Sequence, residues 1–185
     1  RSQPDGFTDN SWPGLPRTSI CYCEHCKTQF QDYAGKALPH AHDWDVEGYR
    51  DWVRWNFQRR TDLWKFNNEV TRAAGGEDCA WMGMIGGELL YNSNRFIDLQ
   101  QILPEAAIVM LDHQRRNAFD GFEQNTEAGK RLHEIAGWDK LIPESMPQYQ
   151  LGSPAFRRAS MPSAEVRLWS SSGFAGGIQP WWHHI

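Results

Sequence analysis

The chain has 185 residues, 40% of them hydrophobic and 13% aromatic, with a formal net charge of −4. This composition is typical of a globular domain, and the slight acidity argues against nucleic acid or an anionic membrane as a partner. No run of eighteen apolar residues predicts a membrane span, and the polar start RSQPDGF lacks the apolar core of a signal peptide. A cytoplasmic location is therefore favoured over a secreted one.

The first third of the chain predicts one strand and one long helix. A short strand is expected at residues 4–10, PDGFTDN, followed by a loop rich in proline and glycine at 11–19. The cysteine-rich segment CYCEHC comes next, at 21–26. From residue 45 to about residue 74, apolar side chains recur at spacings of three, four and seven, which predicts a helix that the glycine pair 75–76 ends.

The rest of the chain alternates between strands and helices. Buried strands are predicted at 79–90, where the strand runs into a loop, and at 106–112, 140–146 and 176–182. Helices are predicted at 94–103, 125–137 and 163–176. Because the strands are apolar on both faces and alternate with helices, we expect a parallel α/β sheet. The sequence has no internal repeat and no interdomain linker, so residues 1–185 are read as one domain.

Polar residues recur just after the apolar strands. They are Asp9-Asn10, Glu88, Asp112-His113, Glu144 and the group Trp181 to His184. A loop carboxylate or a helix cap explains any one of them, but all five fall in the same phase of the repeat. In a (β/α)8 TIM barrel, the carboxyl ends of the strands carry the active site. A doubly wound sheet predicts the same phase, but the glycine-rich phosphate loops that usually accompany it are absent, so we expect a TIM barrel.

Three segments carry a resemblance to a known family. The segment CYCEHCKTQF, shortly after a strand that ends in Asp-Asn, resembles the cysteine segment after the fourth barrel strand of glycoside hydrolase family 42 β-galactosidases. LIPESMPQY is similar to the seventh strand of that family, and AEVRLWSSSGFAGGIQPWWHH to its last helix and eighth strand. The layout also resembles related hypothetical glycosyl hydrolases whose fourth strand ends in Asp-Asn. The resemblance implies that this chain covers strands four to eight of a barrel, the N-terminal part being missing.

The same resemblance implies a structural zinc site. Cys21, Cys23 and Cys26 supply three soft ligands on one short loop, and tetrahedral zinc takes four. In the family the fourth cysteine comes from earlier in the chain. The alternatives are three reduced thiols, or His25 or Cys79 as the fourth ligand. A disulfide framework is disfavoured, because four cysteines so unevenly spaced would constrain little of the chain.

The resemblance also implies a pair of catalytic carboxylates. Glu144 matches the family's nucleophile, and Asp9 stands where the family has its acid/base, although Asp-Asn replaces the family's Asn-Glu. Glu88 is the alternative acid. In α-L-fucosidases of family 29 the nucleophilic Asp ends a comparable fourth strand, which would make Asp9 the nucleophile. A retaining mechanism needs the two carboxylates about 5 to 5.5 Å apart, and an inverting one about 6.5 to 9.5 Å.

The remaining polar and aromatic residues of the expected barrel mouth suit a sugar. Indole rings stack on pyranose faces, and amides, carboxylates and imidazoles bind hydroxyl groups. The candidate binding residues are Asn10, Trp12, Asp112, His113, Gln114, Trp181, Trp182, His183 and His184. Neither an H-E-x-x-H metal motif nor a G-x-S-x-G nucleophile elbow is present, so no catalytic cofactor is expected.

The sequence therefore predicts a glycoside hydrolase that acts on a carbohydrate through two carboxylates. The resemblance implies a retaining enzyme with β-galactosidase-like or α-L-fucosidase-like activity, and a homo-oligomer, a trimer, for the full-length protein. The alternative is a non-catalytic carbohydrate-binding relative of the same barrel, which the Asp-Asn replacement keeps open.

Overall fold

The computed structural model describes residues 4–10, 12–112, 115–116, 121–145, 148–151, 156–159 and 162–181. The main sheet is built from β1 (Gly6–Asp9), β2 (Ala80–Gly86), β3 (Met110–Asp112), β5 (Ile142–Ser145) and β8 (Ile178–Trp181). The helices are α1 (Glu24–Ala34), α2 (Tyr49–Gly75), α3 (Leu89–Asn94), α4 (Leu99–Ile102), the 3-10 turn η1 (Leu103–Glu105), α5 (Glu123–Ala136) and α6 (Ser163–Ala175). A smaller sheet contains β4 (Arg115–Arg116), β6 (Gln148–Leu151) and β7 (Phe156–Ala159).

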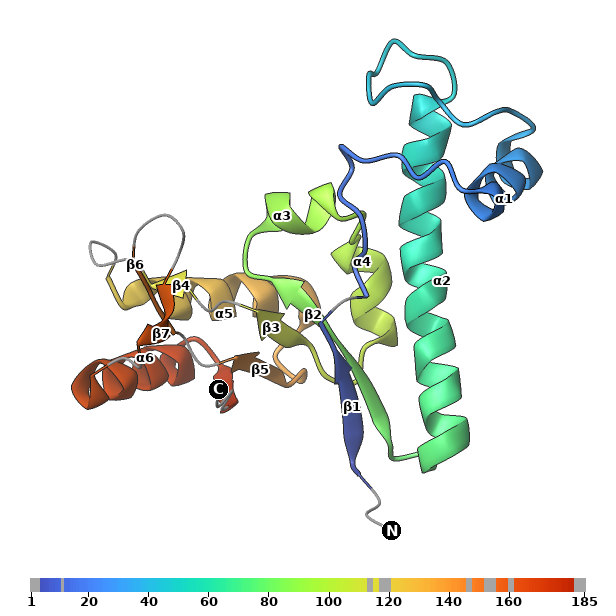
Figure 1. The fold of residues 1–185 in the computed structure, drawn as a ribbon. Helices are drawn as coiled ribbons and strands as arrows, with labels where there is room; N and C mark the ends of the chain where they lie inside the picture. The colour runs from blue at the N-terminus through green and yellow to red at the C-terminus, as the bar shows by residue number, and fades with distance from the viewer. Residues whose placement is uncertain are drawn as a thin grey trace.

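The five strands of the main sheet follow one another in chain order. The order is β1-β2-β3-β5-β8, and every neighbouring pair is parallel (Figure 1). The prediction of a parallel α/β sheet is confirmed. A doubly wound sheet reverses its strand order at a switch point, and these five strands show no such reversal.

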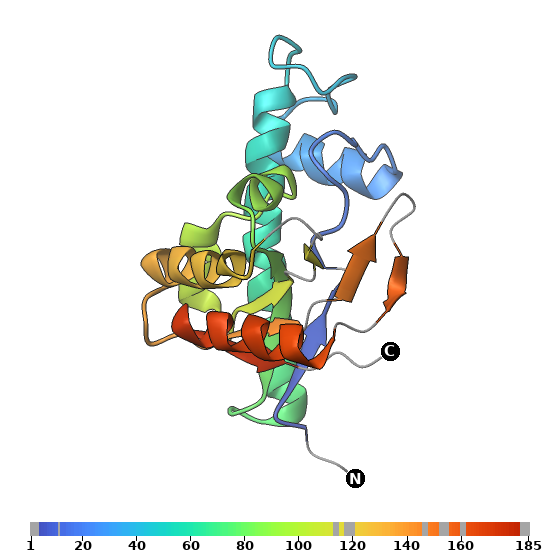
Figure 2. The same cartoon turned by 90° about the vertical axis from the view of Figure 1, so that its left-hand side faces the viewer.

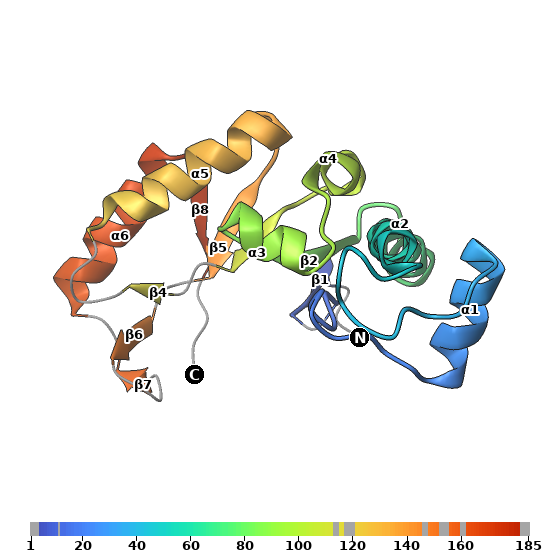
Figure 3. The ribbon, with the colours of Figure 1, turned by 90° about the horizontal axis from the view of Figure 1, so that it is seen from above.

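Helices cover one face of this sheet. Helices α2, α4, α5 and α6 pack side by side in chain order, and from above they follow one another around the arc of strands (Figure 3). Alternate residues of a strand point to opposite faces of the sheet, so every second side chain faces the helices. These helix-facing strand residues form the main core together with apolar residues of the helices. They are Trp81, Ile85, Leu111, Ile142 and Ile178. The opposite face of β2 and β3 carries Met84 and Met110, which are also buried.

The long helix α2 anchors the first two strands. It begins at Tyr49, four residues after the predicted start, because Gly48 adopts a left-handed conformation (φ 79°) that interrupts the helix. Its Trp64 is fully buried and packs edge-on against Trp12 and Trp81, with ring centroids 5.0 and 4.7 Å away. The three indoles tie the helix to β2 and to the loop after β1.

A second, smaller core joins α1 to the first half of α2, above the carboxyl ends of the strands (Figure 2). Cys26 and Phe30 from α1 pack against Trp52 and Trp55 from α2. Helix α1 ends at Gly35, whose left-handed conformation (φ 65°) is one that glycine adopts at low cost. This helix was not predicted from the sequence.

The smaller sheet was also not predicted. Its β6 and β7 are antiparallel, and β4 lies parallel to β6. Strand β4 consists of two arginines, and β7 begins with the basic sequence FRR. In the described part of the chain, no helix combines the length and the apolar character that crossing a bilayer needs.

Candidate functional site

The strand register sets the heights of the predicted catalytic residues. Asp112 is in register with Gly86, the last residue of β2, whereas Asp9 is in register with Gly83, three residues earlier. Glu144 pairs with Leu111 on β3. Three strand spacings separate Asp9 from Glu144, about 14 Å of backbone across the sheet. By register, Asp9 shares the face of Gly83 and Glu144 shares the face of Leu111, and both of these faces meet the helices. Neither side chain is therefore placed on the opposite face of the sheet, where the interior of a barrel would be.

Glu144 lies on the face of the sheet that the helices cover. It follows Ile142 by two residues and is in register with Leu111, and both of these side chains belong to the helix-facing core. The carboxyl is 2% exposed, and its Oε2 accepts a hydrogen bond of 3.2 Å from the indole Nε1 of Trp169 on α6. The sequence predicts Glu144 near the carboxyl end of its strand, and it lies there. The alternation of side chains along the strand directs its carboxyl toward α6, on the helix-facing side of the sheet.

Burial changes the acidity of Glu144. Removal from water raises its pKa from 4.5 to about 8, because a buried carboxylate loses its hydration. Hydrogen bonds from Trp169 and from the side chain of Asn125 on α5 oppose this effect and stabilise the charged form. At neutral pH most of the Glu144 carboxyl is therefore protonated. A protonated acid suits a proton donor better than a nucleophile.

The residues that hold Glu144 were not predicted as site residues. Trp169 is fully buried, and its backbone carbonyl accepts a 3.1 Å hydrogen bond from the Asn125 amide. The segment VRLW contains Trp169, and the resemblance drew attention to it without giving this indole a role. A buried indole N–H needs a hydrogen-bond acceptor. The tryptophan of the segment VRLW is therefore the one sequence signal that could have pointed to a buried carboxyl as its partner.

Glu88 is directed to solvent. Its side chain is exposed, and one oxygen lies 3.8 Å from the guanidinium of Arg131 on α5. Just before it, β2 ends at Gly86, whose N–H and carbonyl are both bonded by the buried side chain of Asn92, at 3.0 and 2.8 Å. Asn92 thus fixes the end of β2, and the side chain of Glu88, two residues later, extends toward α5. This position does not place Glu88 opposite another predicted catalytic carboxylate.

Asp112 is the predicted site residue that register places on the face away from the helices. It follows Leu111, which points to the helices, and it is half-buried at the end of β3. Asn10 is exposed directly after β1. The other binding candidates are outside the described residues, or have side chains outside them: His113, Gln114, Trp181, Trp182, His183 and His184.

Trp12 does not have the exposed ring that stacking on a sugar needs. It is 4% exposed, and its Nε1 donates a 2.7 Å hydrogen bond to the carbonyl of Met84. Its ring also packs edge-on against Trp64 and Trp81. The expectation of a sugar platform was wrong at this position, because the loop after β1 folds back onto the helix-facing core.

The three clustered cysteines form a compact group of ligand atoms. The sulfurs of Cys21, Cys23 and Cys26 all lie within 4.8 Å of one another. Zinc–sulfur bonds of about 2.3 Å place the corners of a tetrahedron about 3.8 Å apart, so small movements would bring these three sulfurs onto one ion. Cys23 caps α1 and Cys26 lies in its first turn, which is why the C-x-x-C spacing brings the two thiols together. The group could hold a metal ion.

The surroundings of the thiols differ. The pKa of the exposed Cys23 is lowered, chiefly because the N–H of Cys26 donates to its sulfur. Burial raises the pKa of Cys26 to about 11, while the nearby guanidinium of Arg59 acts in the opposite direction. A bound cation would favour the thiolate at each position.

Neither of the two residues considered as a fourth ligand, Cys79 and His25, lies with the three clustered cysteines. Cys79 follows the far end of α2, about 30 Å along the helix from Trp55, which packs beside Cys26. Its Sγ is instead 3.5 Å from the carbonyl of Pro4. His25 is exposed and, like every other described His, Cys, Asp or Glu, does not join the group. All four cysteines are free thiols.

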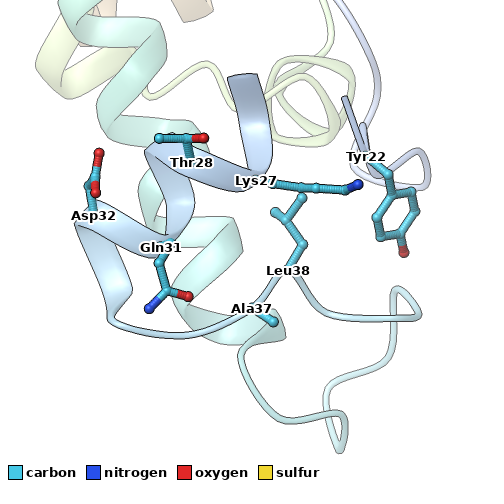
Figure 4. A pocket seen from close by; sticks show the side chains of 7 residues that line it. All are labelled: Tyr22, Lys27, Thr28, Gln31, Asp32, Ala37 and Leu38. Atoms are coloured by element: carbon cyan, nitrogen blue, oxygen red, sulfur yellow. The ribbon is translucent and has the colours of Figure 1, made fainter. Parts of the chain in front are cut away.

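A polar pocket lies beside the cysteine loop, away from the strand ends. It has a volume of about 470 Å³ and is lined by α1 and the segment after it, with Lys27 extending toward Tyr22 (Figure 4). Lys27 is already paired with Glu24 at 2.7 Å, and the Tyr22 hydroxyl donates to the carbonyl of Pro39. We assign no function to this pocket, because its one lysine and its tyrosine hydroxyl already have partners.

Comparisons with known protein families, with curated proteins and with solved structures give no match. The candidate site therefore rests on the geometry of the chain itself.

Proposed function

We propose that this chain is one side of a (β/α)8 barrel that hydrolyses a glycosidic bond in a carbohydrate. The observation that carries the proposal is the sheet: five parallel strands in chain order, with the helices packed in the same order against one face. This is the repeating unit of a barrel, whose active site lies at the carboxyl ends of the strands. The resemblance to family 42 segments supports the same reading.

Asp112 is our first candidate for a reacting carboxylate. It stands at the carboxyl edge on the face away from the helices, where the interior of a barrel would be. Asp9 is the second and weaker candidate, because it ends the edge strand β1, which β2 separates from β3, and is in register with the helix-facing Gly83. Glu144 is better suited to a positioning role, since Trp169 and the helices enclose it. This assignment revises the expected Asp9 and Glu144 pair.

One observation favours the second candidate function, a non-catalytic carbohydrate-binding relative. The residue that matches the family's nucleophile is buried against α6 and mostly protonated at neutral pH. A barrel that had lost its catalytic pair would keep the scaffold and such a buried carboxyl.

The two functions are separated by assaying the full-length protein on a panel of aryl glycosides, with the Asp112→Asn variant beside it. We expect one glycoside to be cleaved, and cleavage to fall by at least about a hundredfold in the variant. No cleavage of any glycoside, together with saturable binding of a sugar by titration calorimetry, would support the binding protein instead. Unchanged cleavage in Asp112→Asn would move the chemistry to Asp9.

The cysteine group is proposed separately as a structural zinc site in the complete protein. Three of the four expected thiolates are already together, and they connect the loop after β1 to α1. Such a site would hold α1 against α2, above the strand ends, without a part in the reaction.

A further inference from the structure

Two arginines of helix α2 line a pocket that has no part in the proposed function. The pocket has a volume of about 200 Å³ and lies between the cysteine loop and α2. Its polar lining includes Ser19, Cys21, Asn56, Arg59 and Arg60, over a floor formed by Trp52, Trp55 and Phe96.

Arg60 is held inside this pocket and keeps an unused donor. Its Nη1 donates to the carbonyl of Trp12 at 3.0 Å, which fixes the direction of the guanidinium. Its Nε is buried and has no hydrogen-bond partner among the described residues. Leaving a buried N–H of a charged group unpaired is costly, so such a donor signals an acceptor that binds there.

Arg59 is also oriented by neutral groups. Its guanidinium lies 4.3 Å from the centre of the Trp55 ring, and its Nη1 is 3.5 Å from Oδ1 of Asn56. A nearby third arginine, Arg95, donates to the carbonyl of Gly14 and lies over Tyr91. Among the described residues, no carboxylate forms an ion pair with Arg59, Arg60 or Arg95.

Burial and the neighbouring positive charges both act on the pKa of Arg60. Burial, and then the charges of Arg59 and Arg95, lower the pKa of Arg60 to about 10. The guanidinium is still charged at neutral pH. The chain as a whole carries a net charge of −4, yet it keeps three cations close together here without an acidic partner in the described chain.

We propose that the pocket between the cysteine loop and α2 binds a small oxyanion, a carboxylate or phosphate group, through Arg59 and Arg60. Guanidinium groups bind both anions with paired, charge-assisted N–H donors, and Arg59 and Arg60 both line the pocket. Ser19 and Asn56 line the pocket and offer neutral donors for the remaining oxygens.

The test is titration calorimetry on the zinc-loaded full-length protein at low ionic strength, with inorganic phosphate, acetate and glucuronate as probes. We expect saturable binding of at least one of them, weakened at least tenfold in Arg59→Gln and in Arg60→Gln. Arg50→Gln is the matched control, since Arg50 is an exposed arginine of the same helix outside the pocket, and its binding should equal that of the unmodified protein.

The probes also identify the source of the anion. Glucuronate bound more tightly than acetate and phosphate indicates a sugar-borne carboxylate, and the reverse order indicates a free oxyanion; both support the site. Arg59→Gln keeps the measurement meaningful if Arg60→Gln misfolds, because Arg59 makes no backbone contact outside α2. Absence of saturable binding would overturn the proposal, as would binding that both variants retain. Binding seen only in the zinc-free protein would also overturn the proposal. In that case the arginines would serve to balance the negative charge of the zinc-bound thiolates and would not be available to an anion.

Discussion

Replacing Glu144 by glutamine should make the protein more stable at alkaline pH and leave its stability nearly unchanged at pH 5. Glutamine has the same shape, its amide oxygen still accepts from Trp169, and it cannot ionise. Because burial raises the Glu144 pKa to about 8, the unfolded chain releases this proton at lower pH than the folded protein does.

The sign of the effect follows from the proton count. Below the pKa of 4.5 both states hold the proton and Glu144 gives no pH dependence. Between 4.5 and about 8 only the folded state keeps it, so the free energy of unfolding falls by about 1.4 kcal/mol per pH unit. Above pH 8 the loss is complete, on the order of 3 to 5 kcal/mol, a large part of the stability of a typical domain.

Urea unfolding followed by circular dichroism from pH 5 to pH 9 measures this difference. The midpoints of the two proteins should differ by about 0.5 M urea or less near pH 5 and by about 1 to 3 M at pH 9, with the variant higher. Glu134→Gln, an exposed carboxyl on α5, serves as the control and should show no divergence. Parallel profiles for Glu144→Gln and the unmodified protein would refute the buried, protonated carboxyl.

Three further predictions concern contacts around the core. Trp169→Phe removes the N–H donor to Glu144, so it should cost about 1 to 3 kcal/mol, more at pH 9 than at pH 5 in the same urea assay; an equal loss at both would contradict the bond. Gly83→Ala would place its methyl group 2.7 Å from Trp64, so thermal unfolding should show a loss of about 1 to 3 kcal/mol, and an unchanged Tm would contradict this packing. Cobalt added to the protein should give a thiolate-to-metal absorption band that Cys23→Ser weakens and Cys79→Ser leaves intact; equal spectra would exclude the cysteine group.

Much of the main sheet could be predicted because its signals are local. The apolar period of α2 and the apolar run of β2 are long enough to fix their identity, and Gly75 marks the helix end. The smaller sheet carries no such pattern. Its strand β4 has two residues, and pairing between segments far apart in the chain decides its structure.

The direction of Glu144 could have been read from the sequence, whereas its surroundings could not. Ile142 and Glu144 are two residues apart, so an inward Ile142 implies an inward Glu144. The partners Trp169 and Asn125 come from two different helices, and only the packing of α5 against α6 brings them to the carboxyl. Helix α1 was missed because its apolar face is short, with Cys26 and Phe30 one turn apart.

The most direct test of the central claim is the ratio of kcat values for Asp112→Asn and Glu144→Gln in the full-length protein at pH 7, on the aryl glycoside it cleaves best. Asp112 lies at the carboxyl edge on the face away from the helices, whereas Glu144 is protonated and points toward them. We therefore expect a loss of at least about a hundredfold for Asp112→Asn and less than about tenfold for Glu144→Gln. The opposite order would show that Glu144 reaches the substrate, and would contradict the site as described.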